Sequence, residues 1–273
     1  MPPSLSRLAI HTITNKPWSL RQCVDAYARA GVGGICVWRN VIEPVGIDEA
    51  ARIVRGSGLR VPALVRGGFF VAGDDDGRRR AEDDNRRCID EAAAIGAEMV
   101  VLVCGARPGT PLPDARKQVA EGIAAVLPHA AERKVKLAIE PLHPMYAADR
   151  SAINRMAEAR QVCEQLRSPW LGIAVDVYHV WWDPDLPEEI AIAGRQGTLF
   201  GFHVCDWRVE TRDLLNDRGL MGDGCIDLRG IRRMVESAGF EGAIEVEVFS
   251  NEYWAMDQEA YLLKILRAYH EHC

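Results

Sequence analysis

Four apolar segments in the second half of the chain each end near an acidic or imidazole side chain. These side chains are Glu140, Asp176, His203 and Glu247. Brought together, three carboxylates would repel one another and raise each other's pKa unless a cation lay among them. Three oxygen ligands and one nitrogen ligand suit Mn2+, Mg2+ or Co2+, whereas structural zinc sites prefer thiolate and imidazole. We therefore predict one divalent metal ion held by these four residues, with Zn2+ as an alternative.

Taken singly, each residue also has an ordinary explanation. A strand histidine such as His203 is usually hydrogen-bonded in a core, Asp176 could cap the turn after it, and Glu140 could pair with an arginine. Their occurrence on four successive segments favours the metal site. Glu245 and Glu247 face the same side of their strand because side chains alternate. We choose Glu247 as the ligand because it lies nearer the C-terminal end, and the sequence identifies no partner for Glu245.

The segments that carry these residues belong to a repeating pattern of short apolar runs and helical stripes. The predicted strands are 8–13, 34–39, 61–66, 99–105, 135–141, 171–180, 200–206 and 243–249. Between them, Ser19 is a predicted helix N-cap before a helix that stops at Gly31, and Asp227 caps another that closes at Gly239. Eight strands alternating with helices predict an α/β fold, a single-domain (β/α)8 TIM barrel over residues 1–273.

A doubly wound open sheet is the competing fold. It usually has a glycine-rich phosphate loop after its first strand, but residues 14–17 read Thr-Asn-Lys-Pro. The barrel is therefore favoured. In such barrels the active site forms at the C-terminal ends of the strands, so the four predicted ligands meet there.

Composition narrows the class of protein. A net charge of −6 disfavours nucleic acid as a partner, because phosphates require a basic face. The N-terminal stretch 1–7 lacks a signal-peptide pattern, and no run approaches the about 18 apolar residues of a membrane span. The eight cysteines form no CxxC pair, which fits reduced thiols. We expect a cytoplasmic enzyme with a small-molecule substrate and no membrane partner.

The chain resembles a known group of barrels. The motifs that carry the resemblance are Glu140-Pro141-Leu142, Asp176-Val177-Tyr178-His179, His203 followed by Arg208, Glu245-x-Glu247-x-Phe249, and Gly222-Asp223-Gly224 with Asp227. They are similar to those of the xylose-isomerase-like superfamily, specifically the sugar phosphate isomerase/epimerase group that includes the ketose 3-epimerases. The resemblance covers essentially the whole barrel and is strongest over residues 140–249. Barrels of this group often pair, so a homo-oligomer is a further expectation.

The resemblance implies roles for individual residues. Glu140 and Glu247 are implied to be both metal ligands and the acid/base pair, and His179 to hydrogen-bond a substrate oxygen. Arg208 is implied to bind substrate, although it follows His203 one residue sooner than in the epimerases. The epimerases also have a glutamate six residues after the strand-five ligand, where this chain has Tyr146. That departure argues against a strict ketose 3-epimerase.

The chemistry of such a site can be stated without the family. A carboxylate can abstract a proton α to a carbonyl, and a divalent metal stabilises the enediolate that forms. The expected function is therefore a metal-dependent isomerase or epimerase of a small keto-sugar or sugar derivative. A lyase or dehydratase acting on a keto-sugar, keto-inositol or 3-keto-glycoside is the alternative, because β-elimination shares the same carbanion. His143, three residues after Glu140, is a further candidate substrate contact, with a simple loop hydrogen bond as the other explanation.

Two other readings are disfavoured. The apurinic endonucleases of this superfamily need extra histidines after strands two and three and an Asp-x-His pair after strand seven. Here those places read Trp38-Arg39, Arg66-Gly67-Gly68 and Asp223-Gly224-Cys225. A barrel that binds without turnover is disfavoured because idle buried carboxylates would cost stability. With no glycine-rich phosphate cradle after strands seven and eight, an unphosphorylated substrate is favoured.

Overall fold

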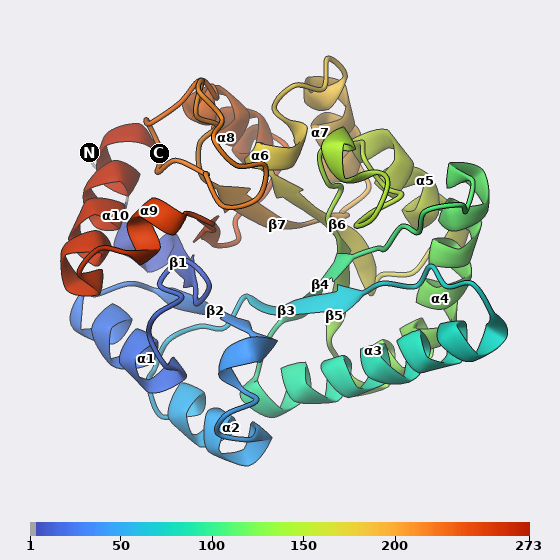
Figure 1. Cartoon of the computed structure of the whole chain (residues 1–273), viewed down its shortest axis with the longest axis horizontal. Helices are drawn as coiled ribbons and strands as arrows, with labels where there is room; N and C mark the ends of the chain where they lie inside the picture. The colour runs from blue at the N-terminus through green and yellow to red at the C-terminus, as the bar shows by residue number, and fades with distance from the viewer. Residues whose placement is uncertain (1–3) are drawn as a thin grey trace.

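The computed structural model describes residues 4–273 as a closed barrel of parallel strands surrounded by helices (Figure 1). Residues 1–3 lie outside the described part. The predictions of a domain starting at residue 1 and of no signal peptide over residues 1–7 both include them. The strands are β1 Leu8–His11, β2 Gly34–Trp38, β3 Ala63–Gly68, β4 Met99–Val103, β5 Lys136–Ile139, β6 Leu171–Asp176, β7 Leu199–Val204 and β8 Ile244–Val246. Each pairs with the next, and β8 pairs with β1, so the predicted (β/α)8 barrel is confirmed.

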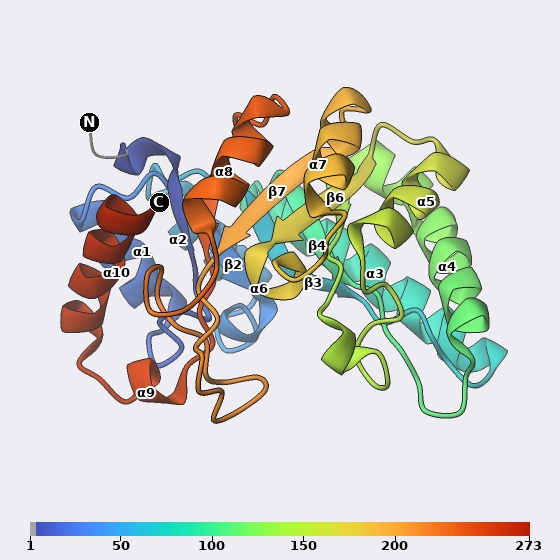
Figure 2. The same cartoon turned by 90° about the horizontal axis from the view of Figure 1, so that it is seen from above.

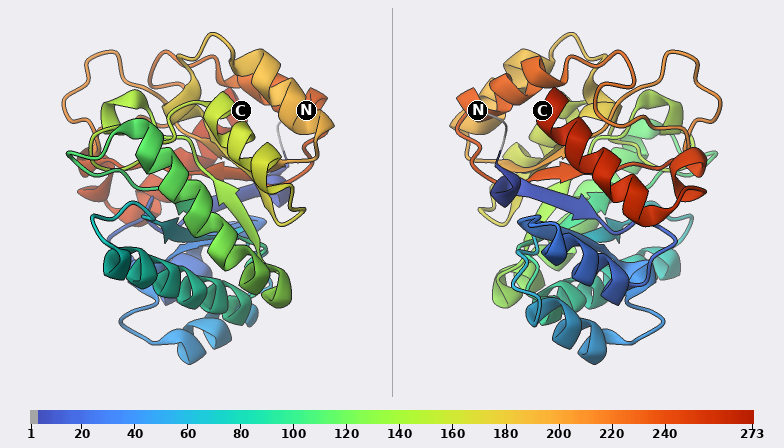
Figure 3. Two further views of the ribbon diagram at one scale, coloured as in Figure 1. Left: turned by 90° about the vertical axis from the view of Figure 1, so that its right-hand side faces the viewer. Right: turned by 90° about the vertical axis from the view of Figure 1, so that its left-hand side faces the viewer.

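Helices fill the outer ring between the strands. They are α1 Leu20–Arg29, α2 Ile47–Arg55, α3 Asp75–Ile95, α4 Leu112–Arg133, α5 Met156–Leu166, α6 Val177–Val180, α7 Leu186–Arg195, α8 Leu228–Ser237, α9 Asn251–Trp254 and α10 Gln258–His272. Figure 3 shows the C-terminal helix α10 beside α1, where Arg29 and Glu259 form an ion pair of 2.7 Å. This contact closes the helical ring where β8 meets β1. Among residues 4–273, no helix has the length and apolarity needed to cross a membrane.

Local sequence signals explain where these helices begin and end. Ser19 caps α1 through a capping box with Gln22, and Gly31 follows the helix with a φ of 72°. The carboxylate of Asp227 accepts a 2.9 Å hydrogen bond from the Gly230 amide at the start of α8. The predicted C-terminal ends of the strands differ from the observed ends by a few residues, and the difference is largest at strand six. The strand expected over 171–180 ends at Asp176, because that side chain accepts the Tyr178 amide and starts the short helix α6.

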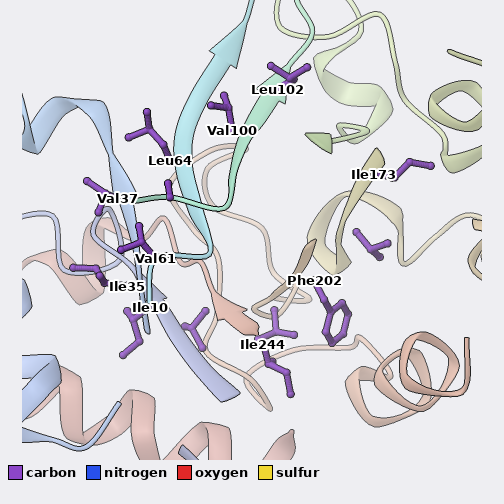
Figure 4. Packing of buried hydrophobic residues seen from close by; sticks show 14 of the residues in the cluster. Ile10, Ile35, Val37, Val61, Leu64, Val100, Leu102, Ile173, Phe202 and Ile244 are labelled. Carbon is purple, nitrogen blue, oxygen red and sulfur yellow. The ribbon is translucent and has the colours of Figure 1, made fainter. Parts of the chain in front are cut away.

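Alternation along each strand separates an outer core from an inner one. Figure 4 shows outward residues of several strands, which pack together with helix residues in one large apolar cluster. Inward-facing residues that precede the C-terminal ends of the strands mostly have small side chains. Examples are Ala9, Ala63, Ala138 and Ala174. The fold is therefore held mainly by the layer between strands and helices. The interior toward the C-terminal ends is left for polar side chains.

Long connections gather at the C-terminal ends of the strands. Figure 2 shows the loop between β7 and α8 on the same side of the molecule as α9. Isolated backbone bridges fasten this loop at two points, pairing Asp206 with Gly219 and Asp217 with Ser250. The loop that the sequence marks as irregular is thus tied to the ends of both β7 and β8.

Candidate metal centre

The strands place the four predicted ligands at inward positions near the same end of the barrel. Asp176 ends β6 and is in register with His203 on β7. Glu140 directly follows β5, and Glu247 directly follows β8. The structure brings all four side chains together, buried, with ligand atoms within 4.8 Å of one another. These are the residues that the sequence analysis selected.

Two of these ligand atoms lack the hydrogen bonds expected of buried polar atoms. His203 Nδ1 and Glu140 Oε1 lie 2.8 Å apart, yet neither has a hydrogen-bond partner among residues 4–273. Buried polar groups are almost always hydrogen-bonded, so such a pair needs an explanation. A cation bound by both atoms provides one. The donor set of carboxylates and one imidazole therefore fits a divalent metal ion.

Beneath the ligands lies a second polar layer, which supplies the partners of Glu245. Its Oε2 accepts a 3.0 Å hydrogen bond from the Cys36 thiol. The same oxygen lies 3.4 Å from His11 Nε2 and 3.5 Å from His203 Nε2. Burial alone would raise the pKa of Glu245, but the two imidazoles outweigh it and lower that pKa to about 2. Glu245 is thus an ionised support for both histidines.

Burial and neighbouring charges act in opposite directions on the predicted ligands. Burial raises the pKa of Asp176 to about 7, with the positive charge of Arg218 opposing the rise. Burial also raises the pKa of Glu247, but His11 and Arg218 more than offset it, so that pKa lies below its usual range. Without a metal, Asp176 and Glu247 therefore differ in protonation state near neutral pH. Binding a cation would favour the ionised form of each.

Arg218 is the main functional residue that the sequence analysis missed. Its Nη1 donates to Asp176 Oδ2 at 2.9 Å and to Glu247 Oε2 at 3.0 Å. The side chain reaches them because it lies between the two backbone bridges that fasten the loop after β7. Nothing in the local sequence marks this arginine, since only the tertiary pairing of the loop turns it inward.

His11 was also missed, although a signal for it exists. It ends β1 at an inward position, which is the same pattern that identified His203. Its Nδ1 lies 3.0 Å from Glu247 Oε1 and 3.1 Å from the indole nitrogen of Trp38. Burial lowers the pKa of His11, but Glu247 and Glu245 raise it overall, so Nδ1 carries a proton that it donates to Glu247 and the contact with the indole N–H is not a hydrogen bond. The polar residue near the end of an apolar strand identified the ligands on strands five to eight. The same criterion applied to strand one identifies His11.

Of the three predicted substrate contacts, His179 lines the pocket beside the ligands, whereas Arg208 and His143 do not. His179 is buried at the mouth, with Nε2 3.1 Å from Arg218 Nη2 and Nδ1 3.2 Å from the His143 amide. Burial and the charge of Arg218 lower its pKa well below the ordinary value, so this imidazole is neutral. A neutral imidazole can accept at only one nitrogen, so one of these contacts is not a hydrogen bond.

Arg208 and His143 do not line the pocket beside the ligands. Arg208 forms a 2.7 Å ion pair with Glu252 and lies over the ring of Tyr253, in a separate depression. The ring of His143 packs against Trp207, and its Nδ1 accepts the Met145 amide. Arg218, rather than Arg208, lines the pocket beside the ligands. The backbone amide of His143, rather than its side chain, meets His179.

A pocket of about 180 Å3 opens above the cluster. Glu140 and Glu247 line it together with His179, Arg218 and the aromatic side chains of Trp38, Tyr146 and Phe249. Its volume is below the about 300–1,000 Å3 of pockets for drug-sized ligands, so it suits a small molecule. Tyr146, which replaces the glutamate of the ketose 3-epimerases, contributes to its wall and donates its hydroxyl to the Leu214 carbonyl.

Comparison with known proteins agrees with this fold. The family model described as xylose isomerase-like TIM barrel matches residues 24–269. The crystal structure of protein SMc04130 from Sinorhizobium meliloti 1021 is 49% identical, with 98% of this chain and 99% of that chain covered and a TM-score of 0.96. A search of curated proteins gave no significant match.

More distant structures share the fold. The IolI protein, solved with a binding zinc atom, is 18% identical over 96% of each chain, with a TM-score of 0.84. The 3-keto-D-glucoside 4-epimerase YcjR from E. coli is 18% identical, with 92% of this chain and 95% of that chain covered and a TM-score of 0.72. At these identities the likeness establishes a common barrel fold.

Proposed function

Since the chain belongs to the xylose isomerase-like TIM barrel family, we propose that it is a divalent-metal-dependent isomerase or epimerase of a small keto-sugar or sugar derivative. The observation that carries this proposal is the buried set of Glu140, Asp176, His203 and Glu247, with ligand atoms within 4.8 Å of one another. The zinc in the IolI structure and the epimerase activity named for YcjR support a metal and a sugar substrate. We keep Mn2+, Mg2+ and Co2+ as the preferred ions and Zn2+ as the alternative.

The residues of the pocket can divide the work of moving a proton. Glu140 and Glu247 both line it, so one carboxylate takes a proton from the substrate carbon beside the carbonyl and the other returns it. The lowered pKa of Glu247 keeps it ionised at neutral pH, as a base must be. When bound, the divalent ion would stabilise the negative charge that develops on the substrate oxygens. His179, buried and neutral, would donate one hydrogen bond to a substrate oxygen or accept one from it.

Metal analysis tests the first part of this proposal. Purified protein loaded with Mn2+ should hold about one ion per chain, and Glu247→Gln should hold much less. Glu241→Gln, an exposed change near the start of β8, is the matched control and should bind metal as the wild type does. Absence of stoichiometric metal in the loaded wild type would refute the proposal.

Reaction in D2O tests the second part. Candidate keto-sugars are incubated with the metal-loaded enzyme, and substrate and product are analysed by mass spectrometry. Deuterium in the recovered isomer or epimer supports the proposal, because the abstracted proton exchanges with solvent before its return. Loss of water or of an aglycone would instead show the lyase or dehydratase reaction, which uses the same carbanion.

A further inference from the structure

Two arginines that line the candidate pocket have no acidic partner. Arg66 and Arg150 both border it, and neither forms a hydrogen bond or ion pair through its guanidinium with any residue in 4–273. A guanidinium is always charged and offers five donors. By contrast, Arg39, just after β2, is matched by Asp84 at 3.0 Å and Glu91 at 2.7 Å. The positive charges of Arg66 and Arg150 therefore remain unmatched by side chains in the pocket that they line.

Aromatic rings hold both guanidinium groups in place. The Arg66 guanidinium carbon lies 4.6 Å from the ring centroid of Phe69 and 5.9 Å from that of Trp38. The Arg150 carbon lies 5.5 Å from the ring centroid of Tyr146. A guanidinium against an aromatic ring keeps its in-plane N–H donors available for an anion. These two arginines are therefore positioned without using up their hydrogen bonds.

The charge balance of the pocket favours an anionic ligand. The buried carboxylates Glu140, Asp176, Glu245 and Glu247 carry four negative charges, whereas a divalent ion with the three pocket arginines carries five positive ones. Burial lowers the pKa of Arg66, and the charge of Arg150 lowers it further, so the two cations are close enough to repel. An anion between them would remove both the repulsion and the excess charge.

We propose that Arg66 and Arg150 bind an anionic group of the substrate, a carboxylate or a phosphate, at the more exposed side of the pocket. This inference rests on the proposed function and narrows its substrate class to a sugar acid or a sugar phosphate. Guanidinium groups form paired, charge-assisted hydrogen bonds with both kinds of anion. The substrate is then held at two ends, by its anionic group at the arginines and by its reacting carbons beside Glu140 and Glu247.

Binding of matched small molecules tests the proposal without requiring turnover. Mn2+-loaded protein is titrated calorimetrically with erythritol, erythronate and erythritol 4-phosphate, which differ in the group at one end. We expect at least one anion to bind about 10- to 100-fold more tightly than erythritol, as lost charge-assisted hydrogen bonds of this kind imply. The anion that binds more tightly identifies the group as carboxylate or phosphate.

Variants show whether the two arginines cause this preference. Arg66→Gln combined with Arg150→Gln should bring the anion to the affinity of erythritol, while each single change gives an intermediate loss. Arg52→Gln, which removes an exposed charge on α2, should leave the preference intact. Equal binding of erythritol and both anions by the wild type would overturn the inference, as would a preference that survives the double change.

Failure of this inference can be told apart from failure of the proposed function. If solvent deuterium enters a neutral keto-sugar but no anion preference exists, only the inference fails. If anions bind through the arginines but no substrate of any charge exchanges deuterium, the proposed reaction fails while the anion site stands.

Discussion

His11 Nδ1 lies 3.0 Å from Glu247 Oε1, so a side chain of the first strand supports a predicted ligand from the last. The same imidazole faces Glu245 through Nε2, at 3.4 Å. Both contacts lie in a buried polar layer where β1 pairs with β8. The metal centre therefore depends on residues outside the four candidate ligands.

Replacement of His11 by alanine should weaken metal binding. The change removes the partner that orients Glu247, and loss of such supporting contacts typically costs about 10- to 100-fold in metal affinity. Competitive titration of Mn2+ against a chelating dye measures the effect. His11→Asn, which keeps a polar group, should recover part of the affinity. An unchanged dissociation constant in His11→Ala would contradict the supporting role.

Replacement of Glu245 by alanine should destabilise the metal-free protein. Glu245 is the shared partner of two buried imidazoles and a thiol, and breaking a buried ion pair costs on the order of 3 kcal/mol. Urea unfolding in EDTA measures the free energy of unfolding. Glu241→Ala, an exposed change near the same strand, is the control and should shift it by less than about 0.5 kcal/mol. Similar losses for the two variants would show that the buried layer adds little stability.

Metal should stabilise the protein more at pH 8 than at pH 6. Burial raises the pKa of Asp176 to about 7, so metal-free protein retains a proton there that the unfolded chain has already released. Stability of the metal-free form is consequently lost as pH rises from the ordinary aspartate range through about 7. The pKa of His203 is also raised, despite burial, by Glu245 and Glu140, which extends the loss to higher pH.

A bound metal requires these groups deprotonated, so it competes with protons at Asp176 below about pH 7 and at His203 up to higher pH. Melting temperatures with and without Mn2+, measured in steps from pH 6 to pH 8, should diverge as pH increases. The affinity for Mn2+ should fall as pH drops below 7. If Mn2+ raised the melting temperature by the same amount at every pH from 6 to 8, the expected protonation of Asp176 would be contradicted.

Replacement of Arg218 by methionine should separate binding of metal from turnover. The guanidinium donates to Asp176 and Glu247, so its removal frees both carboxylates for a cation. Mn2+ stoichiometry should stay near one per chain, while the rate of deuterium exchange falls about 100-fold, as when one charge-stabilising donor is lost from an active site. Glu247→Gln should lose both properties. If Arg218→Met lost the metal instead, the arginine would have a structural role only.

Much of the fold and of the ligand set could be predicted because strand alternation is a local property. Polar residues that interrupt an apolar strand near its end, such as Asp176 and His203, indicate inward positions whichever neighbours surround them. The end of strand six was less predictable. Val177 and Tyr178 have strand-forming side chains, but the Asp176 carboxylate captures the Tyr178 amide and starts a helical turn.

Contacts made by loops could not be read from the sequence in the same way. Arg208 and Arg218 lie in one irregular segment, and spacing from His203 favours the first. The backbone pairing of Asp217 with Ser250 and of Gly219 with Asp206 selects the second, because it turns the side chain between them inward. Pairings between distant segments have no local sequence signature, which also explains why the partners of Glu245 were not predicted.

The separation between outward and inward residues on each strand has a consequence for how such a protein changes during evolution. Residues that stabilise the barrel, such as Leu64 and Val100, face the helices, while those of the pocket face the interior. Arg66 and Arg150 come from different segments, and the guanidinium of neither one donates a hydrogen bond to any residue in 4–273. Either arginine can therefore be exchanged without rebuilding the core, so new substrates are accessible to descendants of this barrel by single substitutions at its rim.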